Sequence, residues 1–174
     1  KYEQRIDPLY YIKYGQFVLA TVRPETKFGD TAVAVNPKDK RYKEYIGKKI
    51  DVKGLLGDFK ISVIADEAVD VTFGTGVVKV TPAHDVVDFE IWQRHKQEIP
   101  GPLQVIDQRG RMDLSAFGDN ENAKKYHGLK VLEARAKVAA DLQAAGLIEK
   151  IEENYQHNIQ LCYKCGTVIE PLIV

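Results

Sequence analysis

The sequence predicts an α+β fold: a mostly antiparallel, partly closed, β-barrel-like sheet with surrounding helices. Many short runs rich in β-branched and aromatic residues recur along the 174 residues. Two or three helical patterns lie among them without the regular alternation that parallel βαβ units require. Because the linkers between these runs are short, we expect residues 1–174 to form a single domain.

The first half of the chain is predicted to be mainly β-structure. Residues 9–14 and 17–22 are strand-like runs separated by Gly15, which indicates a hairpin. Residues 31–35 alternate small and branched side chains before the turn signal Asn36-Pro37, which indicates another strand. The remaining elements expected in this half are a short helix over 39–45 and strands over 60–65 and 77–81.

The second half carries the two clearer helical patterns. Asp85 is expected to be the N-cap of a helix that runs to about Gln97, with Asp88 in a capping-box-like position three residues on. A longer helix is expected over 131–145, ending at Gly146. Its apolar residues at helical spacing are Leu132, Ala136, Ala139 and Leu142. Short strands are expected over 103–106 and 147–151.

The composition argues against several classes of protein. Because 25 basic and 25 acidic side chains cancel, a nucleic-acid partner would need a local patch or another part of a larger protein. No apolar run approaches the length of a membrane span, and the N-terminus lacks the apolar core of a signal peptide. We therefore expect a cytoplasmic chain with no membrane partner. The missing initiator Met and the apolar run at 170–174 suggest a fragment excised from a larger protein.

Both cysteines lie in one Cys162-Tyr-Lys-Cys165 motif, the spacing of a zinc knuckle. A structural zinc site takes four ligands, and His157 would still leave this one incomplete. Two interpretations remain open: half of a structural zinc site completed by residues outside this sequence, or two reduced thiols in a cytosolic protein. A redox role is disfavoured, because no helix-forming pattern follows the motif to lower the pKa of the first thiol.

The segment 73–90 is the most informative part of the sequence. It indicates a Gly-containing turn, an apolar strand and a helix, which would gather Lys79, Thr81, Asp85 and Asp88 at one strand-to-helix junction. Asp85 would be rigidly placed to bind a ligand cation, although capping the helix, at about 1 kcal/mol, would also explain it. Asp88 has an equally simple alternative in the helix dipole. Lys79, within an apolar strand, must face solvent or be paired.

A second polar segment covers residues 20–30. Its Thr21, Arg23 and Thr26 could orient a water and a carbonyl or hold a phosphate, or they could be an ordinary Thr-rich strand end with a surface Arg. His84 is expected to have a positional role, because no Ser or Cys nucleophile lies in a recognisable elbow nearby. Together, the two segments predict a compact polar pocket.

Both segments resemble the inserted editing domain of valyl-tRNA synthetases, called connective polypeptide 1. The matching residues are Thr21-Val-Arg-Pro-Glu-Thr26, Gly29-Asp30-Thr-Ala-Val-Ala-Val35, Gly74-Thr-Gly76, and Lys79-Val-Thr-Pro-Ala-His-Asp85-Val-Val-Asp88. The resemblance covers essentially the whole chain. Its departures are Val22, where Thr is common, and Lys27-Phe28, where Met-Leu is common. Isoleucyl- and leucyl-tRNA synthetases share the fold with other versions of the motifs, so their editing domains remain alternatives.

The resemblance implies post-transfer editing, in which water hydrolyses the ester between a wrong amino acid and the terminal adenosine of the tRNA. Valyl-tRNA synthetases are themselves the standard example of a site that cannot strongly reject threonine by size. The expected substrate is therefore mainly threonyl-tRNA(Val), a mischarged 3′ acceptor end. The expected partner is the rest of an ATP-binding synthetase, with residues 1–15 and 155–174 as the strands that lead to and from its catalytic domain.

The resemblance also implies residue roles. Asp85 would anchor the substrate α-ammonium, and Asp88, assisted by Lys79 and Thr81, would recognise the threonine hydroxyl. Thr21, Arg23 and Thr26 would line the site around the ester and adenosine and help to place the attacking water, with Lys79 and Asp85 in the same catalytic set. No cofactor is implied for editing. Other function classes are a non-catalytic module that docks the tRNA acceptor end, a free-standing hydrolase and a small amino-acid-binding domain.

Overall fold

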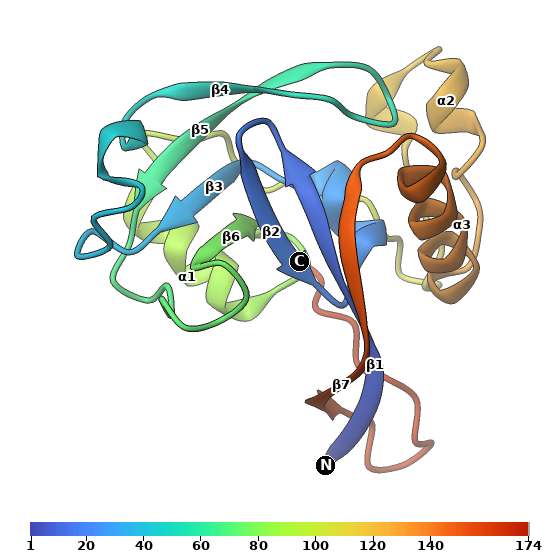
Figure 1. The fold of residues 1–174 in the computed structure, drawn as a ribbon. Coiled ribbons are helices and arrows are strands. Elements are labelled where there is room, and N and C mark those ends of the chain that lie inside the picture. Colours follow the sequence, from blue (N-terminus) through green and yellow to red (C-terminus); the bar gives the residue numbers. More distant parts are fainter. Residues whose placement is uncertain (174) are drawn as a thin grey trace.

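Two β-sheets carry the fold in the computed structural model, which describes residues 1–173 (Figure 1). The first has the order β2-β1-β7 and the second the order β4-β5-β3-β6. The strands are β1 (Tyr2–Tyr14), β2 (Phe17–Thr21), β3 (Ala32–Val35), β4 (Lys49–Val52), β5 (Phe59–Ala65), β6 (Val77–Val80) and β7 (Ile148–Gln160). Only the β3–β5 pair among these is parallel.

The predicted α+β class is confirmed, but the barrel-like closure is not. The strand pairings within residues 1–173 leave two open sheets and no closed barrel. The parallel β3–β5 pair departs from the antiparallel arrangement because β4 intervenes between them in sequence. β4 pairs antiparallel with β5 at the edge, so β5 returns in the direction of β3.

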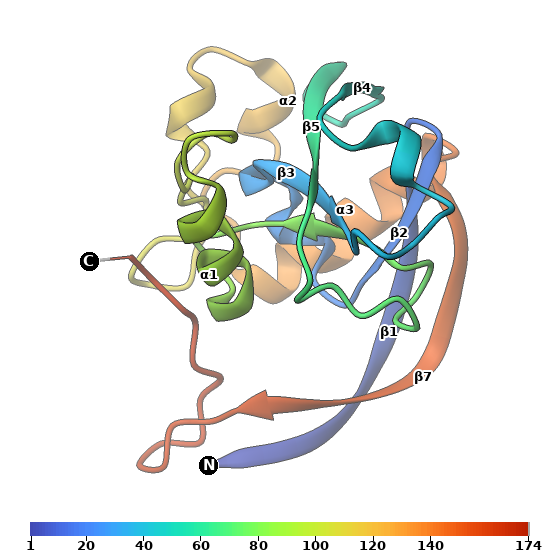
Figure 2. The ribbon, with the colours of Figure 1, turned by 90° about the vertical axis from the view of Figure 1, so that its left-hand side faces the viewer.

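The helices are α1 (Val86–His95), α2 (Glu121–Lys124) and α3 (Val131–Ala144), with short 3-10 turns η1 (Pro24–Gly29), η2 (Lys43–Tyr45) and η3 (Ser115–Phe117). Helix α1 covers one face of the four-stranded sheet, and the first sheet, η1 and α3 lie on its other side (Figures 1 and 2). Alternate residues of β3 divide between the faces. Its valines join the main core with α3, and its alanines pack with Ile91 of α1. This division explains why all four residues of β3 are buried.

The hairpin predicted around Gly15 is confirmed by the antiparallel pairing of β1 with β2. Gly15 has a φ of +58°, and a Cβ at this position would lie 2.5 Å from the backbone oxygen of Asp51. Both the turn and the close approach of β4 therefore require glycine here. The sequence analysis assigned no strand to β4, whose four residues alternate between exposed and buried.

β1 and β7 form a long two-stranded ribbon whose far end projects from the rest of the molecule (Figure 2). Their pairing runs from Tyr2 opposite Gln160 to Ile12 opposite Ile148, with register shifts along the way. Both strands are longer than the runs 9–14 and 147–151 that the residue pattern indicates. The strand that the resemblance predicts over 1–15 agrees with β1, whereas the one predicted over 155–174 ends at Gln160 with β7. The far halves bury little, and pairing between the strands rather than core packing holds them.

One predicted element is wrong, one is found only in part, and one helix has a different buried face. The helix expected over 39–45 is limited to the 3-10 helix η2 at its end. The residues before η2 form turns, in which the Asp39 carboxylate accepts hydrogen bonds from the backbone and side chain of Arg41. Residues 103–106 make only an isolated bridge, from Ile106 to Met112. In α3, Leu132 and Ala136 are exposed, and the buried residues are Ala134, Val138, Ala139 and Leu142.

The other predictions hold to within a few residues. α1 begins after Asp85 and ends at His95 rather than near Gln97, and α3 covers 131–144 of the predicted 131–145. β3, β5 and β6 match the expected runs to within one residue at each end. Among residues 1–173, no helix is long and apolar enough to cross a membrane.

Candidate functional site

All seven residues predicted to catalyse the reaction or bind its substrate line one cavity of about 280 Å³. The cavity lies where β2, β6 and the start of α1 converge, and β7 closes one side. The predicted residues on its wall are Thr21, Arg23, Thr26, Lys79, Thr81, Asp85 and Asp88. Its other lining residues are Ala20, Val22, Phe73, Val78, His84, Tyr155 and His157.

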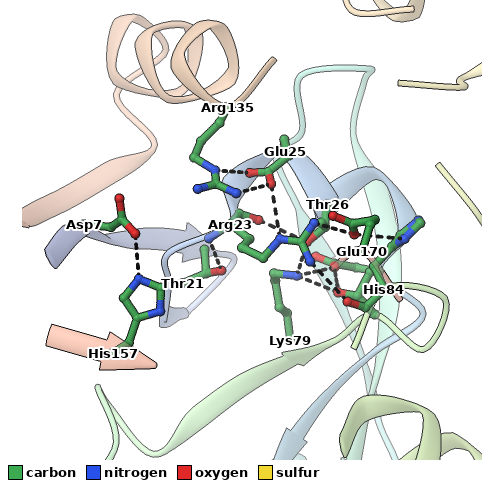
Figure 3. Close-up of polar contacts among 12 residues, drawn as sticks. Asp7, Thr21, Arg23, Glu25, Thr26, Lys79, His84, Arg135, His157 and Glu170 are labelled. Carbon is green, nitrogen blue, oxygen red and sulfur yellow. Dashed lines mark hydrogen bonds and ion pairs between the residues drawn. The ribbon is translucent and has the colours of Figure 1, made fainter. Parts of the chain in front are cut away.

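Lys79 organises the floor of this cavity (Figure 3). Its ammonium donates to the hydroxyls of Thr81 at 2.5 Å and Thr26 at 2.9 Å, and it forms an ion pair with Asp30 at 3.2 Å. These three contacts use all three N–H donors. Of the two alternatives expected for a lysine in this apolar strand, facing solvent or being paired, the structure therefore shows the second.

Asp30 is the carboxylate beneath the floor, and the sequence analysis gave it no role. Its side chain is 1% exposed. One oxygen accepts from the Thr81 hydroxyl at 2.6 Å as well as from Lys79, and the other accepts from the Tyr14 hydroxyl. Burial and the nearby Asp30 raise the pKa of Tyr14 well above its ordinary value, so this phenol stays a donor.

Asp85 and Asp88 stand one turn apart at the start of α1. The Asp85 carboxylate accepts from the backbone N–H of Asp88 at 3.0 Å, so Asp85 caps the helix as predicted. Only one of its oxygens has a hydrogen bond among residues 1–173, and the residue is exposed. Asp85 can therefore cap the helix and bind a cation at the same time.

Asp88 faces inward toward the strand. Its carboxylate accepts from the backbone N–H of Thr81 at 2.8 Å, which ties α1 to the end of β6. Burial, reinforced by the negative charge of Asp85, raises the pKa of Asp88 to about 7. Near neutral pH this group therefore exchanges between a hydrogen-bond donor and an acceptor within the cavity.

Arg23 is held on three sides (Figure 3). Its guanidinium donates to Glu170 at 2.6 Å, to the backbone oxygen of His84 at 3.2 Å and to Glu25 at 3.3 Å. Burial by itself would lower the pKa of Arg23, but the two carboxylates raise it overall. With these partners, Arg23 forms a fixed wall of the cavity rather than a mobile surface side chain.

Glu25 extends the network to α3. Its carboxylate is fully buried and accepts two hydrogen bonds from Arg135, at 2.8 and 3.0 Å. The paired geometry matches the planar fork of the guanidinium. Helix α3 thus supports η1, which carries Thr26 to the cavity.

The three threonine hydroxyls of the cavity differ in whether they can still donate a hydrogen bond. Thr26 donates to the backbone oxygen of Arg23 at 3.0 Å and accepts from Lys79, and Thr81 donates to Asp30. Thr21 accepts from the backbone N–H of Arg23 at 3.0 Å. Within residues 1–173 the Thr21 hydroxyl has no acceptor for its own proton, so it can donate to a group in the cavity.

His84 has the contacts of a positioning residue. Its Nε2 accepts from the backbone N–H of Val105 at 2.9 Å, which makes Nδ1 the protonated nitrogen. Burial, together with the charge of Arg23, lowers the pKa of His84 to about 4, so the ring is neutral. Its Nδ1 is buried without a hydrogen-bond partner within residues 1–173 and lies 3.7 Å from Glu170.

The aromatic rim was not predicted. Tyr155 and His157 stack at 6.1 Å on β7, and Phe73 meets Tyr155 edge-on at 6.2 Å. His157 also contacts the Asp7 carboxylate at 2.7 Å across the ribbon (Figure 3). No local pattern marks these side chains as part of a site, because the resemblance assigns residues 155–174 only to the strand that returns to the catalytic domain.

Cys162 and Cys165 lie in a tight turn after β7. The backbone N–H of Cys162 donates to the backbone oxygen of Thr167, and the backbone N–H of Gly166 donates to the backbone oxygen of Cys162. Gly166 has a φ of +70°. A hydrogen bond with the Thr167 hydroxyl holds the pKa of the Cys165 thiol below its ordinary value. Within residues 1–173, no group of three or more His, Cys, Asp or Glu side chains could hold a metal ion.

Comparison with known proteins gives a consistent result. The chain is 49% identical over 174 residues to a valine–tRNA ligase of Carboxydothermus hydrogenoformans, covering 97% of the chain and 18% of that protein. It is 47% identical over 179 residues to the enzyme of Symbiobacterium thermophilum (99% and 18%) and 45% identical over 177 to that of Thermotoga maritima (98% and 19%). No protein-family model matches the chain.

These matches place the chain with the aminoacyl-tRNA synthetases. More particularly, the chain is homologous to one segment of valine–tRNA ligase, as its motifs indicated. It spans less than a fifth of the length of these relatives.

Proposed function

We propose that this chain is an editing domain that hydrolyses mischarged tRNA(Val), mainly threonyl-tRNA(Val), after transfer of the amino acid. The observation that carries the proposal is the convergence of seven predicted polar residues on one cavity. Hydrogen bonds from Lys79, to Asp30 and from the backbone of Arg23 hold the threonine hydroxyls there in position. A site that acts by orienting its substrate needs such groups to be fixed before the substrate binds.

The amino acid would be read by two carboxylates. Asp85 has a free oxygen for the substrate α-ammonium, and the start of α1 holds it in position. Asp88 would exchange a hydrogen bond with the threonine hydroxyl, at a distance set by the Thr81 backbone. Valine would place a methyl group against Asp88 and leave that polar group without its partner, at a cost of about 1–3 kcal/mol.

The ester would lie near the threonine hydroxyls. Thr21 has a proton free to donate to the ester carbonyl or to the attacking water, whereas the hydroxyls of Thr26 and Thr81 are committed. Arg23 would act by holding this turn rather than by binding the substrate directly. With His84 neutral and turned toward Val105, proton transfer would rest on the attacking water and the ribose hydroxyl of the tRNA.

The test is deacylation of threonyl-tRNA(Val) and valyl-tRNA(Val) at high protein concentration. We expect fast loss of threonine with valine retained. Loss of both at equal rates would contradict hydroxyl recognition by Asp88. Loss of neither, with the acceptor end still bound, would instead support a module that docks the tRNA without chemistry.

The two roles of Asp85 can be separated by a matched pair of variants. Asp85→Asn keeps an N-cap acceptor but removes the charge, whereas Asp85→Ala removes both. Deacylation should fall by about two orders of magnitude in both variants, because each loses the ion pair with the substrate. Stability should fall by about 1 kcal/mol in Asp85→Ala alone. Glu90→Gln, an exposed change on the same helix, is the control.

The domain would act as part of a cytoplasmic, ATP-dependent synthetase. Strand β1 and the chain after β7 would connect it to the rest of that protein. The knuckle of Cys162 and Cys165 would supply half of a structural zinc site. Two thiols, one at a lowered pKa, and a tight turn at Gly166 fit a tetrahedral thiolate site. Because residues 1–173 offer no further ligands, the other half would come from elsewhere in the synthetase.

A further inference from the structure

A second cavity, of about 330 Å³, shares no lining residue with the first. Its walls are largely apolar, with Leu55, Leu56, Leu103 and Phe117 among them. Lys27 and Asp30 also line it. The volume is at the lower end of the range for small-molecule sites, roughly 300–1,000 Å³.

Within the described residues 1–173, the Lys27 ammonium at this cavity has no carboxylate partner of its own. The residue is 5% exposed, and its side chain makes no hydrogen bond or ion pair within residues 1–173. It lies 5.5 Å from the ring centre of Tyr14 and 5.7 Å from those of Phe28 and Phe59. Aromatic faces attract the charge, but they offer no oxygen to its three N–H donors.

The nearby acids do not supply the missing partner. Both oxygens of Asp30 are already used, by Lys79, Thr81 and Tyr14. Asp58, the other acid in the wall, is mostly exposed and pairs with Lys53. The ammonium groups of Lys27 and Lys79 are therefore both buried near a single buried carboxylate, that of Asp30. One of the two positive charges has no negative charge to balance it. In keeping with this, burial lowers the pKa of Lys27 to about 8, with Asp30 opposing the shift.

We propose that this second cavity binds a small organic monocarboxylate with an apolar tail. The carboxylate would sit on the Lys27 ammonium, and the tail would lie against Leu55, Leu56 and Leu103. A single unpaired charge favours a monoanion, because a dianionic phosphate would bury a second uncompensated charge.

Calorimetric titration with hexanoate at pH 7 tests the proposal. Hexanoate should bind about tenfold or more tightly than acetate, which lacks the tail, or hexanamide, which lacks the charge. In Lys27→Met, hexanoate binding should fall about tenfold or more, since a charge-assisted hydrogen bond is lost. Lys38→Met, at an exposed lysine paired only with Glu67, should bind as the wild type does. Thermal unfolding would verify that both variants are folded.

A second readout does not depend on a variant. Hexanoate should raise the pKa of Lys27, measured by NMR at the carbon next to its amine, because a bound carboxylate stabilises the ammonium. An unchanged pKa at saturating hexanoate would overturn direct contact with Lys27. No binding at millimolar hexanoate, or equal binding by wild type and Lys27→Met, would overturn the site itself.

Discussion

At the scale of single residues, the candidate site is held by charged groups whose hydrogen bonds are already made within the protein. Lys79 spends its three donors on Thr26, Thr81 and Asp30, and Arg23 is shared between two carboxylates and a carbonyl. Among the seven predicted site residues, and within residues 1–173, free hydrogen-bonding capacity remains on the Thr21 hydroxyl, one oxygen of Asp85 and the titrating carboxyl of Asp88. A substrate would therefore meet a rigid frame with a small number of open contacts.

Asp88 makes the stability of the protein depend on pH. Its pKa of about 7 in the folded state lies above the ordinary 3.8, so the folded state binds this proton more tightly than the unfolded chain. The stabilisation is complete below about pH 4 and is lost as the pH rises to 7. The advantage of Asp88→Asn over wild type in unfolding free energy should therefore grow by about 2 kcal/mol between pH 5 and pH 8.

Urea unfolding of both proteins at the two pH values measures this difference. Glu90→Gln, an exposed acid on the same helix, should show no comparable change. A constant difference between Asp88→Asn and wild type would mean that Asp88 is ionised throughout this range.

At the scale of elements, α3 supports η1 through a buried ion pair. Arg135→Met would leave the fully buried Glu25 with only its 3.3 Å contact to Arg23, and we expect it to cost about 3 kcal/mol of stability. Adding Glu25→Gln should recover part of that loss, giving a coupling energy of about 1–3 kcal/mol in a double-mutant cycle. Chemical denaturation of the four proteins measures the cycle.

Lys137→Met on the same helix is the control for this prediction. Its partner, Asp141, is about one-third exposed, so the loss should stay below about 1 kcal/mol. Equal losses in Arg135→Met and Lys137→Met would show that the Glu25 pair does not hold the two elements together.

Elements were predicted well from the sequence where their burial in the core requires a recognisable pattern of apolar residues. β3, β6, α1 and α3 have apolar patterns or a capping acid, and they appear close to their expected ranges. In the outer half of β7 only the resemblance indicates a strand. The residue pattern does not, because the residues are largely polar and the stability of this half comes from pairing with β1. The phase of α3 was misjudged for a related reason: an alanine-rich helix has a weakly defined apolar face, and Leu132 is 66% exposed.

The site was predictable only in part. The residues of the two motifs converge because each follows a strand that ends at the same place. Their supports come from distant parts of the chain: Arg135 is 110 residues from Glu25, and Glu170 is 147 residues from Arg23. A lone charged residue at such a separation carries no local pattern, so only the tertiary structure reveals it.

At the scale of the whole molecule, the segment after β7 returns to the site. Glu170 brings this segment onto Arg23 and near His84 (Figure 3). We expect Glu170→Ala to lower stability by about 1–3 kcal/mol and to slow single-turnover deacylation several-fold, since Arg23 loses a charge-assisted partner. Hydrogen exchange should show faster opening around residues 166–171.

Glu170→Gln is the matched variant, since its amide oxygen can still accept from Arg23. It should retain most of the protection and most of the deacylation rate. A Glu170→Ala protein with unchanged exchange in this segment would show that the segment does not depend on the Arg23 contact.

The β1–β7 ribbon gives the molecule an uneven response to mechanical load. Lys1 and Leu161 meet at its tip, where the backbone amino group of Lys1 donates to the Leu161 oxygen at 3.2 Å. A force that separated these two strands at the tip would break their cross-strand bonds one pair at a time, starting from Tyr2 and Gln160. Such peeling needs far less force than sliding whole strands past each other. The ribbon would therefore act as a compliant stem that yields before the sheets around the cavity are strained.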